Sequence, residues 1–177
     1  SKPGKFDYAN FGFGTRGQTM GVQFNRVAGL DAGTVSYKGS PAALQDVMGG
    51  QVPLMFDGPA TSLPFIKAGK LRAYAVASPR RMVALPDVPT FTEAGYPDLQ
   101  DVSWMGIWSA QGVPPAVMTK MRDATLKVTQ SPTLRPRLED MGMEPGSTAT
   151  TDELLKDVRE SYERQGALLR SIHFKPD

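Results

Sequence analysis

Short apolar runs alternate with amphipathic stretches from residue 5 to residue 77, and this alternation constrains the fold more than any other feature. The apolar runs predict β-strands over residues 6–10, 34–37, 52–56 and 71–77, and the stretches between them have the spacing of helices. Strands that alternate with helices favour parallel pairing through right-handed crossovers. The strands are apolar on both faces, as a sheet covered by helices requires. The first half of the chain is therefore predicted to be an α/β layer structure.

Glycine, proline and hydroxyl residues mark where the predicted helices begin and end. The first helix is expected to end at Gly29. The second helix is expected to have Ser40 as its N-cap, Pro41 as its first residue, and Gly49 and Gly50 at its end. The third helix is expected to begin at Thr61 or Ser62 and to end at Gly69. These markers indicate short elements joined by tight turns.

The pattern changes after residue 78. Residues 79–102 are rich in proline and predict a surface connection with at most one helical turn, around Thr92. Residues 103–110 predict an aromatic-bearing strand. Three helices are then expected: one over residues 114–130, one capped by Ser131 and stopped by Gly142, and one capped by Thr150 or Thr151 with Glu153 as capping-box partner. We expect two segments, a compact α/β unit over residues 1–102 and a mainly helical portion with one strand over residues 103–177.

The composition argues against several classes of function. A net charge of +2, with basic residues scattered among acids, gives no electrostatic footprint for nucleic acid. The absence of cysteine excludes thiolate metal sites and cysteine nucleophiles, and a single histidine, His173, argues against a histidine metal site or a Ser-His-Asp triad. No apolar run spans a bilayer, and the first residues do not read as a signal peptide. We expect no catalytic residue, no metal and no cofactor.

The segment GFGTRG matches G-x-G-x-x-G through Gly12, Gly14 and Gly17, between a predicted strand and a predicted helix. A dinucleotide site would also need an acidic residue at the end of the next strand, and that strand reads TVSYKGS. A less specific interpretation is an anion cradle, in which Gly12 and Gly14 allow close backbone approach, Thr15 adds a hydroxyl and the helix start offers free N–H groups. The alternative that the glycines only make a tight turn remains open.

Two further strand ends carry polar residues. Asp57 follows the apolar strand over residues 52–56, and Tyr37 and Ser40 follow the strand over residues 34–37. The ends of parallel strands meet at one edge of an α/β sheet, where ligands bind. The polar residues after the three strand ends together therefore indicate a small-molecule site. The alternative for Asp57 is that it caps the helix that follows it.

A set of motifs then gives a resemblance to a known family. The chain contains Y-K-G-S, G-G-Q-V, M-F-D, I-K-A-G-K-L-R-A, L-P-D-V-P-T and E-A-G-Y-P, preceded by GKFDYANFGFGT. This set closely resembles the tripartite tricarboxylate transporter substrate-binding proteins, called the Bug family, and it extends over almost the whole chain. The resemblance implies a periplasmic, non-enzymatic binding protein with a type II α/β sandwich fold, which passes a small carboxylate to membrane transporter subunits.

The resemblance also assigns roles to individual residues. Gly12, Gly14 and Thr15 match one of the two loops that hold the ligand carboxylate, and Asp57 matches an acid that meets a ligand amine or hydroxyl. Phe13 stands where the family often has Asn or Ser, and Gly58 where it often has Asn. Phe13 and the neighbouring Arg16 are expected to alter ligand choice: Arg16 either pairs a second carboxylate or is a solvated side chain. The rival function is a small nucleotide-dependent enzyme that uses the GFGTRG loop.

The family's other ligand loop, P-F-x-x-G-G, is absent from these 177 residues. The chain is expected to begin at the family's second lobe and to return into the first lobe from about residue 103. We therefore expect weak carboxylate binding by this chain alone. The predicted strand over residues 103–110 would lack its neighbouring strands, which leaves its large apolar side chains exposed, Met105 among them. We therefore expect a homodimer that forms through Trp104, Ile107 and Trp108.

Overall fold

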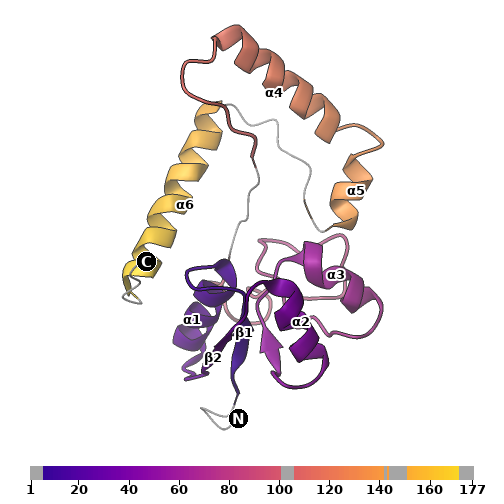
Figure 1. Cartoon of the computed structure of the whole chain (residues 1–177), viewed down its shortest axis with the longest axis vertical. Helices are drawn as coiled ribbons and strands as arrows, with labels where there is room; N and C mark the ends of the chain where they lie inside the picture. Colours follow the sequence, from indigo (N-terminus) through magenta and orange to yellow (C-terminus); the bar gives the residue numbers. More distant parts are fainter. Residues whose placement is uncertain (1–5, 101–105, 142, 144–150, 172–177) are drawn as a thin grey trace.

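Three short parallel strands form the sheet at the centre of the α/β unit (Figure 1). The computed structural model describes residues 6–100, 106–141, 143 and 151–171. The strands are β1 (Tyr8–Asn10), β2 (Thr34–Ser36) and β3 (Leu54–Met55), in the order β2-β1-β3. Ala9 of the central strand lies opposite Val35 on one side and Met55 on the other. Parallel pairing follows from the helix that separates each strand from the next.

Three helices accompany these strands: α1 (Arg16–Ala28), α2 (Ser40–Met48) and α3 (Pro59–Lys67). Side chains of successive strand residues point to opposite faces, so Tyr8 and Ala9 contact different helices. Ala9 packs with Ala43 of α2 and with Val52, whereas the Tyr8 hydroxyl donates to the Gln18 carbonyl of α1 at 3.5 Å. In Figure 1 the strands accordingly lie between α1 and α2.

The two faces of the sheet carry different cores. The α2 face is aliphatic, and partly buried Val35, Tyr37, Val47 and Met55 surround its centre. The α1 face is aromatic: the Phe24 ring lies 5.7 Å from Phe56 and 5.8 Å from Tyr96, centroid to centroid. Edge-on and tilted ring pairs of this kind contribute about 0.5–1.5 kcal/mol beyond their buried area. The segment around Tyr96 thereby packs against α1.

The predicted strand over residues 71–77 is wrong. Val76 forms only an isolated parallel bridge with Thr90, and its amide donates to Pro89 rather than to the sheet. Arg72 and Tyr74 point to solvent, with the guanidinium 5.2 Å from the ring centroid. The β-branched and apolar composition of this run reflects partial burial against the 79–100 connection, not strand pairing.

Helix boundaries agree with expectation in part. Gly29 caps α1 as predicted, and α2 ends before Gly49. Ser40 is the first residue of α2 rather than its cap, because the helix starts from Gly39. The third helix starts earlier than predicted, at Pro59, because proline is well suited to the first turn of a helix.

The turn predicted near Thr92 is present and has a capping box. The Thr90 amide donates to Glu93 Oε2 at 2.7 Å, and the Glu93 amide donates to Thr90 Oγ1 at 3.1 Å. Hydrogen bonds from the Arg81 guanidinium, and then from the Thr90 amide, lower the pKa of the Glu93 carboxyl. These bonds tie the proline-rich connection to the turn that carries Phe91 and Tyr96.

The second half of the chain contains α4 (Pro115–Thr129), α5 (Arg135–Asp140) and α6 (Thr151–Ser171), as three predicted helices required. Ser131 caps the turn before α5, since its hydroxyl accepts the Leu134 amide. The predicted markers Gly142 and Thr150 lie outside the described residues. Figure 1 shows α4 at the far end of the molecule from the sheet.

The strand predicted over residues 103–110 is also wrong where the structure describes it. Residues 106–110 have no regular secondary structure, and Ile107 and Trp108 are exposed. Trp104 and Met105 lie outside the described residues. No residue of α4 or α5 is buried. None of the described helices combines the length and apolar character needed to cross a membrane.

Candidate functional site

The carboxyl ends of the three strands lie at one edge of the sheet, because all of them are parallel. Three exit loops begin there: residues 11–15 after β1, 37–39 after β2 and 56–58 after β3. Each exit leads directly into the start of a helix. Helix starts present N–H groups without helical partners and the positive end of the helix dipole. This edge is where an α/β sheet can hold an anionic small molecule.

The loop after β1 has the conformation that its glycines allow. Gly12 has φ 142° and Gly14 has φ 73°, values that disfavour residues with a side chain. Thr15 is the N-cap residue of α1, but its hydroxyl donates to the Gly12 carbonyl at 2.7 Å instead of capping the helix. Thr15 thus closes the loop on itself at the point where α1 begins.

Asn10 is a site residue that the sequence analysis missed. Its side chain is completely buried, its Oδ1 accepts the Gly12 amide at 2.9 Å, and its Nδ2 donates to the hydroxyls of Thr34 and, at 3.1 Å, Ser36. Asn10 therefore connects the glycine loop to β2. The available signal was a polar residue at the end of an apolar strand, directly before a glycine-rich loop.

Gln18 is the second missed residue. It lies at the third position of α1, is 6% exposed, and accepts the Gly14 amide on Oε1 at 2.6 Å. In a capping box this side chain would accept the amide of the N-cap residue, whereas Gln18 accepts the amide one residue earlier and the Thr15 hydroxyl does not cap the helix.

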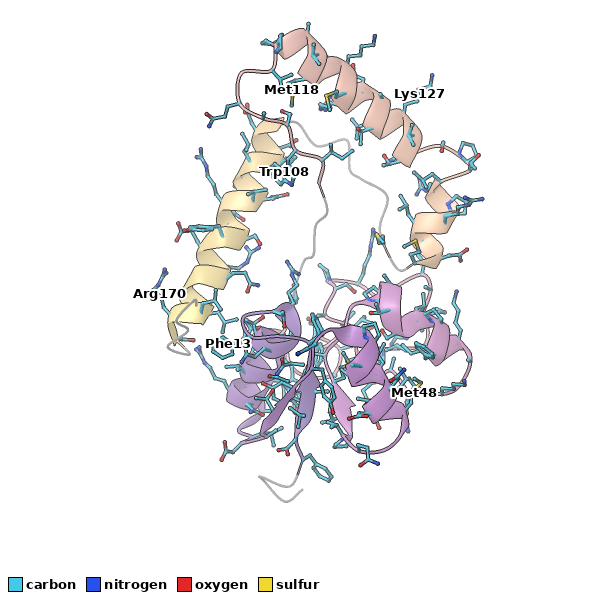
Figure 2. The ribbon with its side chains drawn as sticks, viewed as in Figure 1. Phe13, Met48, Trp108, Met118, Lys127 and Arg170 are labelled. Carbon is cyan, nitrogen blue, oxygen red and sulfur yellow. The ribbon has the colours of Figure 1, made fainter. Side chains whose placement is uncertain are left out.

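Phe13 and Arg16 lie where the loop meets solvent. The Phe13 side chain is 64% exposed, and Figure 2 shows it at the surface of the α/β unit. Arg16 is half-buried at the first position of α1, and the first turn of this helix contains no acidic residue.

Asp57 and Ser40 are brought together, although the strands that they follow, β3 and β2, are not neighbours but lie on either side of β1. Ser40 Oγ donates to Asp57 Oδ1 at 2.8 Å, and Thr61 Oγ1 donates to Asp57 Oδ2 at 2.6 Å. The carboxylate thus accepts a hydroxyl from the start of α2 and another from the first turn of α3. Tyr37 has a different environment, because its hydroxyl donates to Asp46 at 2.8 Å and its ring packs in the aliphatic core.

Gly17 links the glycine loop to the exit that carries Asp57. A Cβ atom on Gly17 would lie 2.8 Å from the Phe56 carbonyl oxygen, closer than side chains tolerate. The start of α1 can therefore approach the backbone immediately before Asp57 only with glycine at this position. Asn10 and Gly17 together hold all three exits in one group.

Other parts of the described chain are weaker candidates for a binding site. The described residues contain no group of three or more His, Asp or Glu side chains that could hold a metal ion. A hollow of about 280 Å³ lies along α6, but a single helix contributes its lining, which includes Asp152, Lys156 and Glu160. Residues from one exposed helix face cannot enclose a ligand, so the strand ends remain the candidate site.

Comparisons with known proteins bear on the fold and the family of the chain. The model of a family described as the tripartite tricarboxylate transporter family receptor matches residues 1–174. A structure described as a periplasmic transporter is 38% identical with a TM-score of 0.86, over 99% of this chain and 58% of its own.

Two solved relatives come from Rhodopseudomonas palustris and contain dicarboxylates. One, with adipate, is 27% identical with a TM-score of 0.84, over 96% of this chain and 56% of its own. The other, with bound malate, is 29% identical with a TM-score of 0.80, over 94% of this chain and 57% of its own. These similarities confirm the expected α/β fold of periplasmic binding proteins. The chain spans about half the length of the curated relatives it matches.

Proposed function

The chain belongs to the tripartite tricarboxylate transporter family of receptors, and we propose that it forms one ligand-binding lobe of a periplasmic protein that captures a dicarboxylate. The family binds solutes and does not convert them, so the expectation of a binding protein rather than an enzyme is confirmed. The lobe in question comprises residues 6–100, whose strand ends carry the candidate site.

One observation supports an anionic ligand above the others. The start of α1 meets the glycine loop at the end of the central strand, bears Arg16 and contains no acidic residue in its first turn. Backbone amides at such a position form charge-assisted hydrogen bonds to a carboxylate. Two relatives with this fold contain adipate and malate, which independently points to a dicarboxylate.

The second half of the chain has a separate role in this proposal. Residues from about 103 onward return to the other lobe, which supplies the opposite ligand loop, and the loaded protein delivers its ligand to membrane transporter subunits. The exposed apolar side chains of α4 support this arrangement, because helices that pack in a lobe present such a face to their neighbours. With one loop only, this chain should bind its ligand weakly.

Weak binding can be located by following backbone amide NMR signals of the 177-residue chain during titration with adipate and with malate. We expect the signals of Arg16 and Gly17 to shift in a saturable way at millimolar ligand, because their amides lie in the first turn of α1. Acetate serves as the single-carboxylate control and should shift the same signals less.

Two outcomes would contradict this function. One is a folded chain in which neither dicarboxylate shifts the loop signals at any soluble concentration. The other is a saturable shift of the same signals by NAD alone, which would favour the nucleotide-dependent alternative.

A further inference from the structure

Three backbone amides of the glycine loop after β1 (residues 11–15) already donate hydrogen bonds within the chain. The Gly12 amide donates to Asn10 Oδ1 at 2.9 Å, and the Gly14 amide donates to Gln18 Oε1 at 2.6 Å. The Thr15 amide donates to the Gly12 carbonyl at 3.3 Å. An amide that is satisfied in this way gains little free energy from a ligand carboxylate. These amides therefore hold the loop in shape, and the contribution of the loop to ligand choice must come from another group.

The two phenylalanines of this loop have different environments. Phe11 is half-buried and packs against the start of α1, since a Cβ atom on Gly17 would lie 2.7 Å from Phe11 Cε1. Phe13 is 64% exposed, and Figure 2 shows it at the surface of the α/β unit. The burial of a large apolar side chain is what stabilises a fold, so a ring as exposed as that of Phe13 contributes little to folding.

The backbone on either side of Phe13 fixes where this exposed ring lies. Gly12, with φ 142°, and Gly14, with φ 73°, flank it, and the hydrogen bonds described above hold both glycines. The loop follows the central strand, so Phe13 lies at the edge of the sheet that also carries Ser40 and Asp57. A side chain on a backbone that is already ordered costs little conformational entropy when a ligand covers it.

We propose that Phe13 is a specificity-determining residue whose ring contacts the apolar middle of the ligand, so that the site prefers dicarboxylates with a long unsubstituted carbon chain to short ones. This inference rests on the proposed function and deepens it, because that function specifies the charges of the ligand but not the chain between them. The ring covers methylene groups that would otherwise stay in water, and each methylene group removed from water strengthens binding up to about fourfold. One solved relative contains adipate, which has such a chain.

A series of ligands that differ only in chain length tests this contact without a change of charge. The 177-residue chain is titrated with succinate, glutarate and adipate, and the affinities are measured from the amide NMR signals of Arg16 and Gly17. The affinity of the wild type should rise about two- to fourfold with each added methylene group. Phe13→Ser should bind succinate as the wild type does, but it should bind adipate no more than about twofold more tightly than succinate, because the ring that covers the chain is gone.

Two further variants and one direct measurement complete the test. Phe6→Ser is the matched control, because Phe6 is 56% exposed and lies before β1, at the opposite end of the strand from the loop. It should keep the wild-type increase with chain length, and Phe13→Leu should keep most of it because leucine is also apolar. With adipate at saturation, the Phe13 ring protons of the wild type should show nuclear Overhauser effects to the ligand methylene protons, which a purely structural role of Phe13 would not produce.

Several results would overturn the inference. These are a wild-type affinity that does not rise with chain length, an unchanged rise in Phe13→Ser, or an equal loss of succinate and adipate affinity in Phe13→Ser, which would mean that Phe13 supports the loop or packs on another surface. Loss of the rise in Phe6→Ser would do the same. If Phe13→Ser did not fold, the absence of ring-to-ligand Overhauser effects in the wild type would still decide against the contact. Failure of the proposed function gives a different result, because the wild-type chain itself would then respond to none of the three dicarboxylates.

Discussion

At the scale of single residues, the site depends on side chains that hold the backbone in place. Asp57 illustrates this, because each of its carboxylate oxygens already accepts a hydroxyl, one from Ser40 and one from Thr61. Its negative charge lies beside two helix starts, where it favours the folded state. The same charge lies at the edge of the sheet where a dicarboxylate would approach, so it works against an anionic ligand.

Replacement of Asp57 should separate stability from binding. Asp57→Asn should lower the free energy of unfolding by about 1–2 kcal/mol, measured by urea denaturation, because both hydroxyls lose a charged partner. Adipate affinity should remain equal or increase, because a repulsive charge has been removed. The control is Asp98→Asn, which removes the same charge from an exposed loop. A tenfold loss of affinity in a folded Asp57→Asn would instead mean that Asp57 contacts the ligand.

Residues that lie at the strand ends were easier to predict than residues whose side-chain amides hold the loops in place. Gly12, Gly14, Ser40 and Asp57 each follow a strand, and strand ends can be located from apolar runs alone. The environment of Asn10 depends on which side chains lie across the sheet from it, and the strand order β2-β1-β3 is not visible in local sequence. Tyr37 was placed at the correct strand end, but its hydroxyl points toward Asp46.

At the scale of elements, α1 is shaped by two glycines that allow close packing. A Cβ atom on Gly17 would meet the Phe11 ring and the Phe56 carbonyl, and one on Gly21 would overlap the Tyr8 ring. Intrinsic helix propensity favours alanine over glycine by about 1 kcal/mol, so packing must outweigh propensity at both positions. The approach of α1 to β1 and β3 is therefore set by the absence of side chains on one helix face.

Two glycine substitutions should have opposite effects. Gly21→Ala should destabilise the α/β unit by about 1–3 kcal/mol, because the new methyl group forces the Tyr8 ring to move within a packed layer. Gly166→Ala in α6 should be neutral or increase helix stability, because its Cβ would meet only the Arg170 guanidinium, at 3.4 Å. Thermal unfolding followed by circular dichroism measures both. Equal effects of the two substitutions would show that packing against Tyr8 does not limit α1.

The types of β1, β2, β3 and the six helices were predicted correctly. In these segments the spacing of the apolar residues agreed with the glycine, proline and capping residues at the ends. The runs over residues 71–77 and 103–110 have the composition of strands, but among the described residues they form no more than the single bridge between Val76 and Thr90. Strand formation requires a partner edge, and composition cannot show whether that edge is present. This is why both strand predictions were wrong although the apolar pattern was read correctly.

At the scale of the whole molecule, the two halves of the chain differ in how much they bury. The α/β unit has an aliphatic core and an aromatic core, whereas α4 and α5 bury no residue. Exposed apolar side chains of the second half include Ile107, Trp108, Val117 and Val128. Apolar surface of this extent is a site of association, because burying each large side chain is worth about 1.5–3 kcal/mol.

The chain should therefore associate with itself as its concentration is raised. Sedimentation velocity should show a rising average mass for the wild type, and Ile107→Ser combined with Trp108→Ser should reduce it. Val83→Ser is the control, because Val83 is also exposed but belongs to the α/β unit. A wild type that remains monomeric at high concentration, or an equal reduction by Val83→Ser, would contradict association through Ile107 and Trp108.

The buried amide of Asn10 has a consequence for the energetics of recognition. Through it, the backbone of Gly12 and the hydroxyl of Ser36 share a single rigid hydrogen-bonded group. A ligand atom that contacts the loop after β1 and another that contacts the loop after β2 therefore do not contribute independent increments of free energy. Ordering one loop lowers the entropic cost of ordering the other, so the two ends of a ligand should bind cooperatively.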